Sequence, residues 1–244
     1  KRDIETTMTL DDVKQIVSVF QNSEEPLNQW IWHGGEPLLM GEDFLYEASQ
    51  IVRDAFPQIR LAIQTNGTLI REKTIELFKK TKMRPGLSFD GIHNVSTRND
   101  TERLLHVFNL LEKHRIDFGA IMLITEKNVA NSAAEYEFAK RLKIHQQMNL
   151  VFSVSDNPGA VEIESQRAIE GICNFFDYWV KDSNNPRNSK LLSGYVRLIS
   201  GSGNQRSCCE QHCLGRWFGI HSNGDIYPCG RNWSGKYKYG NIYD

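Results

Sequence analysis

The sequence predicts an α/β fold in which parallel strands alternate with helices. Short apolar segments recur through about the first 155 residues, and each is followed by a segment whose apolar residues have helical spacing. Such alternation implies parallel pairing with right-handed crossovers, in either a barrel or an open doubly wound sheet. The chain has 244 residues, 40% hydrophobic and 24% charged, so it is long enough to bury a sizeable core.

The first predicted element is a helix at residues 10–21. Val13, Ile16 and Val17 recur at helical spacing, and Thr9 and Asp12 match a capping box. Strands, some of them running into a turn, are expected next in the segments NQWIWH, RLAIQTNG, GLSFDG, FGAIMLIT and NLVFSVS. Helical spacing predicts helices between them, at residues 45–52, 70–80, 104–111 and 133–142.

The pattern changes after residue 155. A longer helix is expected at residues 162–181, a linker-like break at NNPRNS, and a short helix in LLSGYVRLIS. The last segment is rich in Gly, Cys and aromatic residues, and Asn223-Gly224 predicts a hairpin turn there. We therefore expect three parts: a domain at 1–155, a helical connection at 156–203 and a small module at 204–244.

Charge and hydropathy exclude several classes of partner. The formal net charge is -1 and no basic stripe accompanies the aromatic residues of the tail, so no nucleic-acid partner is expected. No apolar run approaches the roughly 20 residues that span a bilayer, and the first residues do not resemble a signal peptide. We expect no membrane partner and a cytoplasmic location.

Chemically distinctive residues follow three of the predicted strands. Parallel α/β folds bind ligands at the carboxyl ends of their strands, whether the sheet is closed or open. The candidate residues at these ends are Gly34, Gly35 and Glu36, then Gln64 and Asn66, then Ser88 and Asp90. Asn-Gly and Asp-Gly are common turn dipeptides, so any one of these segments could be a structural turn. Together they favour an active site.

The cysteines point to a metal centre near the end of the chain. Cys208, Cys209, Cys213 and Cys229 are clustered there, whereas Cys173 stands alone in a helical pattern and is expected in the core. In a reducing compartment such clustering favours a metal or a metal cluster over disulfides. Four thiolates also suit zinc, which remains an alternative.

Several motifs together resemble one family, the radical S-adenosylmethionine enzymes with a cysteine-rich C-terminal extension called SPASM. The resemblance covers nearly the whole chain. It rests on HGGEPLL at 33–39, QTNGTLI at 64–70, SFDG at 88–91 with Arg98 downstream, and Cys213, Gly224 and Cys229 near the end. It implies a partial (β/α)6 TIM-like barrel followed by a small SPASM-like module.

The resemblance also implies roles for the candidate residues. Gly34 and Gly35 would let the backbone approach S-adenosylmethionine, and Glu36 would meet its ammonium group. The expected cofactor-binding residues are Gly34, Gly35, Glu36, Asn66, Ser88, Asp90 and Arg98. Gln64 would be catalytic, nearer the substrate. A solvated helix start remains an alternative for Arg98, and a structural turn for Asp90.

Two [4Fe-4S] clusters are implied. The ligands of the first, in the CxxxCxxC motif that defines the family, are absent from this sequence. We expect truncation to explain the absence, with a degenerate homologue as the alternative. The second, auxiliary cluster would be bound by Cys208, Cys213 and Cys229, and Cys209 could replace Cys208.

The resemblance implies modification of a peptide or protein substrate through a 5'-deoxyadenosyl radical, with a reductant such as flavodoxin or ferredoxin. The favoured activity is that of a ribosomal-peptide maturase, which would install a carbon-carbon or thioether crosslink on a precursor peptide. Anaerobic sulfatase maturation is an alternative. Enzymes of that type usually have an aspartate directly after the cysteine equivalent to Cys229, whereas this chain has Gly230. A non-catalytic homologue that binds S-adenosylmethionine or a peptide is a further alternative.

Overall fold

The structure is a computed structural model that describes residues 7–22, 27–92, 101–142, 145–150, 163–183, 190–201, 217–229 and 235–244. The chain divides into two compact units. The first unit comprises Lys1–Ile31, Met40–Leu61 and Arg206–Asp244, and the second comprises Trp32–Leu39 and Ala62–Gln205.

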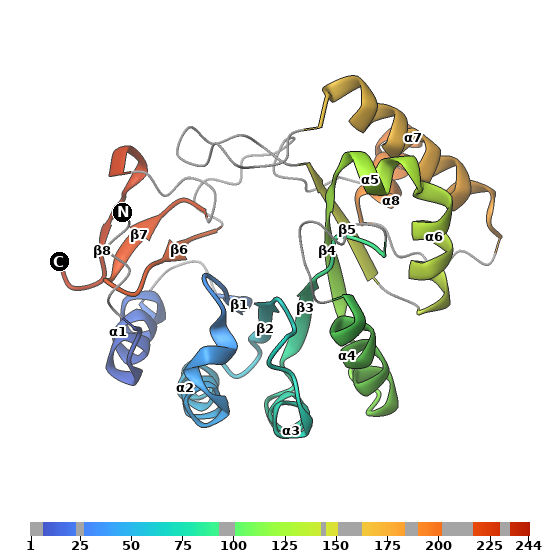
Figure 1. Ribbon diagram of the computed structural model, residues 1–244. Helices are drawn as coiled ribbons and strands as arrows, with labels where there is room; N and C mark the ends of the chain where they lie inside the picture. The colour runs from blue at the N-terminus through green and yellow to red at the C-terminus, as the bar shows by residue number, and fades with distance from the viewer. Residues whose placement is uncertain are drawn as a thin grey trace. The chain divides into compact units, whose positions relative to one another are not determined.

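A five-stranded sheet has its strands in chain order. The strands are β1 (Gln29–Trp32), β2 (Arg60–Thr65), β3 (Arg84–Ser88), β4 (Gly119–Ile124) and β5 (His145–Leu150). Pairing is parallel from β2 to β5, as Figure 1 shows. The predicted parallel α/β fold is therefore confirmed, and the partial barrel stays a prediction.

Helices connect and follow these strands. Their bounds are α1 (Leu10–Gln21), α2 (Glu42–Ala55), α3 (Glu72–Thr81), α4 (Thr101–Lys113), α5 (Glu126–Ala130), α6 (Ser132–Arg141), α7 (Ser165–Lys181) and α8 (Lys190–Ile199), with short 3-10 turns η1 (Pro37–Met40) and η2 (Gly235–Tyr237). Among the described helices, none combines the length and apolarity needed to cross a membrane.

The core of the second unit follows the twofold alternation of its strands. Alternate residues of β2, β3 and β4 are buried, so one face of the sheet is apolar and the other is half-exposed. Phe108 of α4 stacks on Phe118 and meets Phe89 edge-on, with ring centroids 5.5 and 5.1 Å apart. The half-exposed face carries the polar side chains of Gln64 and Ser88.

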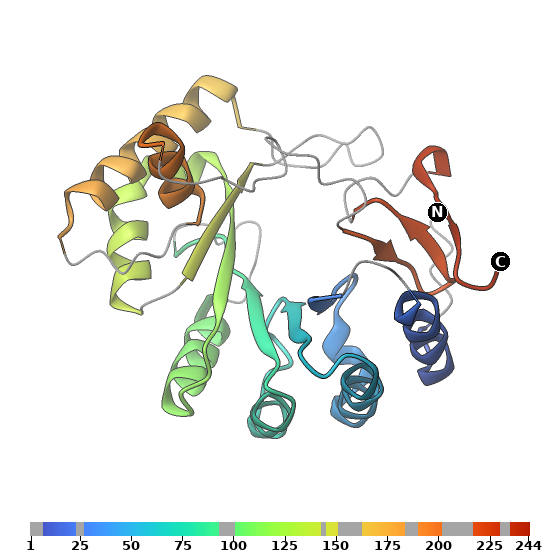
Figure 2. The same ribbon diagram turned by 180° about the vertical axis from the view of Figure 1, so that it is seen from behind.

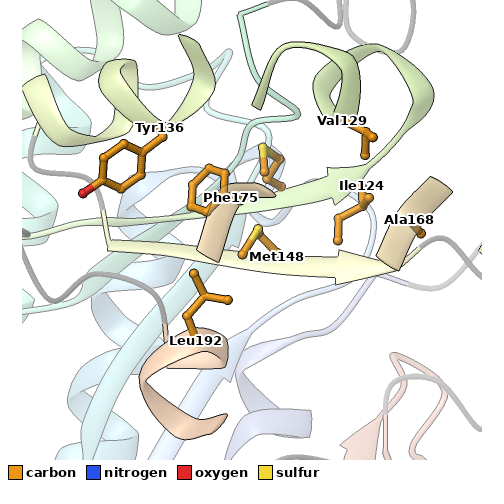
Figure 3. Close-up of a cluster of buried hydrophobic side chains, with 8 residues drawn as sticks. Ile124, Val129, Tyr136, Met148, Ala168, Phe175 and Leu192 are labelled. Atoms are coloured by element: carbon orange, nitrogen blue, oxygen red, sulfur yellow. The ribbon is translucent and has the colours of Figure 1, made fainter. Parts of the chain in front are cut away.

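A second apolar cluster joins α7 and α8 to the sheet. Its members are Met122, Ile124, Val129, Tyr136, Met148, Ala168, Phe175 and Leu192. In Figure 3, Ile124, Val129 and Ala168 lie together, and Phe175 lies beside Tyr136 and Met148. α8 lies against β5 and α7 against α5 and α6, as both ribbon views show (Figures 1 and 2).

The first unit contains α1, α2 and a small antiparallel sheet of β6 (Gly219–Ile220), β7 (Asp225–Tyr227) and β8 (Gly240–Asn241). The predicted capping box of Thr9 and Asp12 starts α1, and the predicted hairpin joins β6 to β7. Gln15 Nε2 donates to the carbonyl oxygen of Ile242 at 2.7 Å, and the Tyr243 hydroxyl donates to Asp12. The chain end is thereby bonded to α1.

Three details differ from the prediction. β5 begins at His145 rather than at residue 149, because HQQMNL has too few apolar residues to read as a strand. β3 begins before Pro85, a residue that argues against a strand because it lacks a backbone donor. Cys173 is exposed, so its expected place in the core was wrong. The residues of α7 that are buried are Ala168, Gly171 and Phe175, on another face of the helix.

Candidate functional site

Glu36 bonds the segment after β1 to the turn after β2. Its Oε1 accepts hydrogen bonds from the Thr65 hydroxyl at 2.7 Å and from the backbone N–H of Leu38 at 3.1 Å. Its Oε2 accepts from the backbone N–H of Asn66 at 2.8 Å. The carboxylate therefore fixes two of the predicted ligand-binding segments against each other.

The two glycines before Glu36 are required by backbone conformation. Gly34 has φ +95° and Gly35 has φ +54°, values in the left-handed region that favours glycine. A Cβ on either would meet nothing within 4 Å, so neighbouring atoms do not crowd this backbone. A ligand can thus approach it closely. Desolvation lowers the pKa of the preceding His33, which favours its neutral form at neutral pH.

The turn after β2 is held by its own side chains. Asn66 Oδ1 accepts from the backbone N–H and the hydroxyl of Thr68, at 2.8 and 2.7 Å. Gly67 donates its N–H to Thr65 Oγ1 at 3.0 Å. Because its carboxamide oxygen is committed to this turn, Asn66 would present its NH2 group to a ligand.

Gln64 and Ser88 are joined across neighbouring strands. Gln64 Nε2 donates to Ser88 Oγ at 3.0 Å. Both residues are half-buried, and the register pairs Gln64 with Gly86, two residues before Ser88. Their polar groups therefore lie on the half-exposed face of the sheet.

Asp90 faces the protein interior and is only 3% exposed. Its Oδ1 accepts from the backbone N–H of Leu123 on β4 at 3.1 Å. Its carbonyl oxygen accepts from Asn128 Nδ2 at 3.1 Å, and Asn128 Nδ2 also donates to the carbonyl oxygen of Leu123 at 2.6 Å. Asp90 thus bonds its turn to β4, in agreement with the structural alternative for this residue.

The structure brings some candidate residues together and leaves others outside its description. Hydrogen bonds link Glu36 to Asn66 and Gln64 to Ser88, while Asp90 bonds to β4. Arg98, Cys208 and Cys213 lie outside the described residues. Cys229 is half-buried just after β7. The binding and catalytic roles of all these residues stay predictions.

Sequence reasoning missed residues that support the site without belonging to a motif. Thr65 bonds to Glu36, and Asn128 and Glu135 bond to the turn after β3. Thr65 stands next to Asn66, so its position was a usable signal. Asn128 and Glu135 lie far along the chain from the turn after β3, so the sequence carried no signal that they would bond to it.

The sequence profile of the Radical SAM superfamily matches residues 1–139, more than half of the chain. The chain belongs to the radical SAM superfamily. The structure adds to this assignment by placing the turns after β2 and β3, with the Gly34–Glu36 segment, within one compact unit.

Curated relatives of this radical SAM chain include anaerobic sulfatase-maturating enzymes. The cysteine-type enzyme of Clostridium perfringens is 26% identical over 230 residues, which cover 87% of this chain and 62% of that protein. The serine-type enzyme of Bacteroides thetaiotaomicron is 26% identical over 262 residues, covering 95% of this chain and 63% of that protein. The chain thus spans less than two thirds of the length of either relative.

Solved structures share the radical SAM fold. Native anSMEcpe with bound AdoMet superimposes with a TM-score of 0.85 at 22% identity, covering 97% of this chain and 69% of that one. Streptococcus suis SuiB bound to precursor peptide SuiA gives a TM-score of 0.65 at 17% identity, covering 100% of this chain and 58% of that one. These similarities extend over the second unit, which carries the candidate site.

The described residues suit S-adenosylmethionine, the cofactor of the radical SAM superfamily. Uncrowded backbone at Gly34 and Gly35, the anionic Glu36 and the half-buried polar groups of Asn66 and Ser88 offer partners for its ammonium, carboxylate and ribose groups. For an iron-sulfur cluster, the described ranges contain no group of three or more His, Cys, Asp and Glu that could hold a metal. The cluster ligands therefore stay predictions.

Proposed function

We propose that this chain is part of a radical enzyme that modifies a peptide or protein and binds S-adenosylmethionine at the carboxyl ends of β1, β2 and β3. The observation that carries the proposal is the hydrogen-bonded junction of Glu36 with Thr65 and Asn66, in a chain of the radical SAM superfamily. This junction lies at the edge where parallel α/β folds bind ligands.

Glu36 can serve both the fold and the cofactor. A carboxylate offers about four lone-pair sites, and three of those on Glu36 accept hydrogen bonds within the protein. The remaining site and the negative charge suit the ammonium group of S-adenosylmethionine. Asn66 and Ser88 would contribute hydrogen bonds to the ribose or carboxylate, and Arg98 would pair with the carboxylate.

When bound next to a reduced [4Fe-4S] cluster, S-adenosylmethionine supplies a 5'-deoxyadenosyl radical that abstracts a hydrogen atom from the substrate. The complete protein would hold that cluster through a CxxxCxxC motif, and would hold an auxiliary [4Fe-4S] cluster through Cys208, Cys213 and Cys229. Flavodoxin or ferredoxin would act as the reductant. Residues 1–155 would form the partial barrel, 156–203 the connection and 204–244 the SPASM-like module.

Two substrate classes fit this proposal. A precursor peptide that receives a carbon-carbon or thioether crosslink is supported by Gly230, because a sulfatase maturase usually has an aspartate there. Oxidation of a Cys or Ser in a sulfatase is supported by the curated relatives, which carry that activity in their names. Either substrate would enter as a peptide, as in the solved complex of anSMEcpe with Cp18Cys peptide.

The proposal is tested on the complete protein from the native gene, reconstituted anaerobically. Iron and sulfide content and electron paramagnetic resonance are measured with and without S-adenosylmethionine. A cluster spectrum perturbed by S-adenosylmethionine is expected, whereas protein without iron, or with zinc alone, would overturn the radical mechanism and favour a binding homologue.

The substrate class is then tested with peptides. The reconstituted protein is incubated with a Cys- or Ser-containing sulfatase peptide and, separately, with a precursor peptide encoded beside its gene. Tandem mass spectrometry would locate a crosslink in the precursor peptide, and hydrazine trapping would reveal an aldehyde in the sulfatase peptide. The product formed decides between the two classes.

A further inference from the structure

The side chain of Gln64 on β2 passes over Gly86, which has no side chain, and bonds to Ser88 on β3. Gln64 lies opposite Gly86 in the β2–β3 register, and its Nε2 bonds diagonally to Ser88 Oγ at 3.0 Å. Residues at opposite and diagonal positions on one face of a sheet are close enough for long side chains to touch. Gly86 therefore lies beneath the carboxamide of Gln64.

The absence of a side chain at position 86 leaves room for this arrangement. A Cβ on Gly86 would lie 2.5 Å from Gln64 Oε1 and 3.5 Å from its Cδ. The first distance is too short for two unbonded heavy atoms, so any other residue would push the carboxamide away from its position. The lack of a side chain at Gly86 thus leaves room for the carboxamide of Gln64 in the position from which it bonds to Ser88.

The direction of this hydrogen bond decides what Ser88 can do. A serine hydroxyl has one donor and two acceptor lone pairs. When Ser88 Oγ accepts from Gln64 Nε2, its own O–H remains available to donate to another acceptor. Ser88 is half-buried at the carboxyl end of β3, where a ligand oxygen would be that acceptor.

We propose that Gln64 is a positioning residue that fixes the hydroxyl of Ser88 as a hydrogen-bond donor toward S-adenosylmethionine, and that Gly86 makes this possible. The proposal rests on the proposed function, since it assumes that cofactor. It differs from the expected catalytic role of Gln64, because Gln64 acts through Ser88 and not on the substrate.

The test is a double-mutant cycle on the affinity for S-adenosylmethionine, measured by isothermal titration calorimetry with the complete, anaerobically reconstituted protein. Ser88→Ala, Gln64→Ala and Gly86→Ala should each weaken binding by up to about tenfold, the effect of one lost hydrogen bond. In the Ser88→Ala background, adding Gln64→Ala or Gly86→Ala should change the affinity no further. If the losses of affinity instead multiply in the double variants, Gln64 acts independently of Ser88, and the proposal is overturned.

Gln64→Glu tests the direction of the bond. A carboxylate only accepts hydrogen bonds, so Ser88 would turn its O–H toward Glu and away from the ligand. Binding of S-adenosylmethionine should weaken as much as in Ser88→Ala. Wild-type affinity in Gln64→Glu would overturn the assigned direction.

Controls separate positioning from folding. Gly235→Ala places a Cβ in open space and should leave affinity unchanged. Only variants with the same thermal unfolding midpoint as the wild type are compared. A loss of binding in such a variant is not caused by unfolding. Failure of the wild-type protein to bind S-adenosylmethionine would overturn the proposed function as well. If the wild type binds but the affinity losses of the single variants multiply in the double variants, this inference alone is overturned.

Discussion

The carboxylate of Glu135 on α6 occupies the space where Gly91 would carry a side chain. A Cβ on Gly91 would lie 2.6 Å from the carboxyl carbon and from both oxygens of Glu135. Glu135 is 1% exposed, and its Oε2 accepts from the backbone N–H of Ile92 at 3.0 Å. The turn after β3 is therefore positioned by a helix more than forty residues further along the chain.

This packing predicts a large effect of Gly91→Ala. Gly91 has φ +97°, so alanine would combine backbone strain with a clash against buried Glu135. The free energy of unfolding in urea should fall by about 2–4 kcal/mol. Gly201→Ala is the matched control, because Gly201 has φ +65° but open space around it, and it should lose only about 1 kcal/mol. Equal losses would contradict the role of Glu135.

Asn128 should not tolerate a carboxylate. Its Nδ2 donates to the carbonyl oxygens of Asp90 and Leu123, and its side chain is buried. Asn128→Asp would place a charged oxygen against those two carbonyls, and we expect a loss of about 2–4 kcal/mol in urea unfolding.

The control for this change is Asn131→Asp, because Asn131 is exposed while its Nδ2 donates to the carbonyl oxygen of Lys127. For Asn131→Asp, the free energy of unfolding should fall by less than about 1 kcal/mol. A small loss for Asn128→Asp would show that the turn after β3 does not depend on this bond.

Glu36→Gln should weaken binding of S-adenosylmethionine more than Thr65→Val does. Glutamine removes the negative charge that the ammonium group would meet. Valine at 65 removes the hydrogen bond to Glu36 and the one from the Gly67 N–H, but it leaves the charge. By calorimetry on the complete protein, we expect about tenfold weaker binding or more for Glu36→Gln and a smaller change for Thr65→Val. The reverse order would mean that Glu36 serves only the fold.

Lys238 should control the titration of Asp225 in the small sheet. Lys238 Nζ lies 2.5 Å from Asp225 Oδ1, and this hydrogen bond lowers the pKa of Asp225. The bond therefore adds stability above the unfolded pKa of an aspartate, and that stability is lost as pH falls through the lower folded pKa.

Lys238→Met should raise the pKa of Asp225, as followed by NMR of its carboxyl carbon. Lys236→Met is the control, because Lys236 lies over the ring of Tyr237 instead. An unchanged titration curve in Lys238→Met would disprove the assigned cause of the shift.

Local patterns predicted elements of the fold, but not the hydrogen-bond partners within the candidate site. The capping box of α1 and the turn at Asn223-Gly224 depend on residues close in sequence, and both were found. β5 was misplaced because Met148 is the only strongly apolar residue among its first five. The partners of Glu36 and Gly91 are set by strand order and helix packing, which no local pattern specifies.

The motifs predicted where the candidate residues lie, but not which atoms their side chains bond to. The turn residues were expected at the carboxyl ends of strands, where they lie. The side chain of Asp90, however, accepts a hydrogen bond from the backbone N–H of Leu123, and Gln64 bonds to Ser88. A one-dimensional pattern gives a residue's position along a strand and leaves open which of its neighbours its polar atoms will bond.

The apolar cluster of Figure 3 has a consequence for synthesis of the chain. Its members run from Met122 to Leu192, so strands β4 and β5 cannot complete their packing until α8 has left the ribosome. Until then the cluster would lack the contacts that Leu192 supplies. The packing of this cluster should therefore be completed only once the chain has been extended beyond α8.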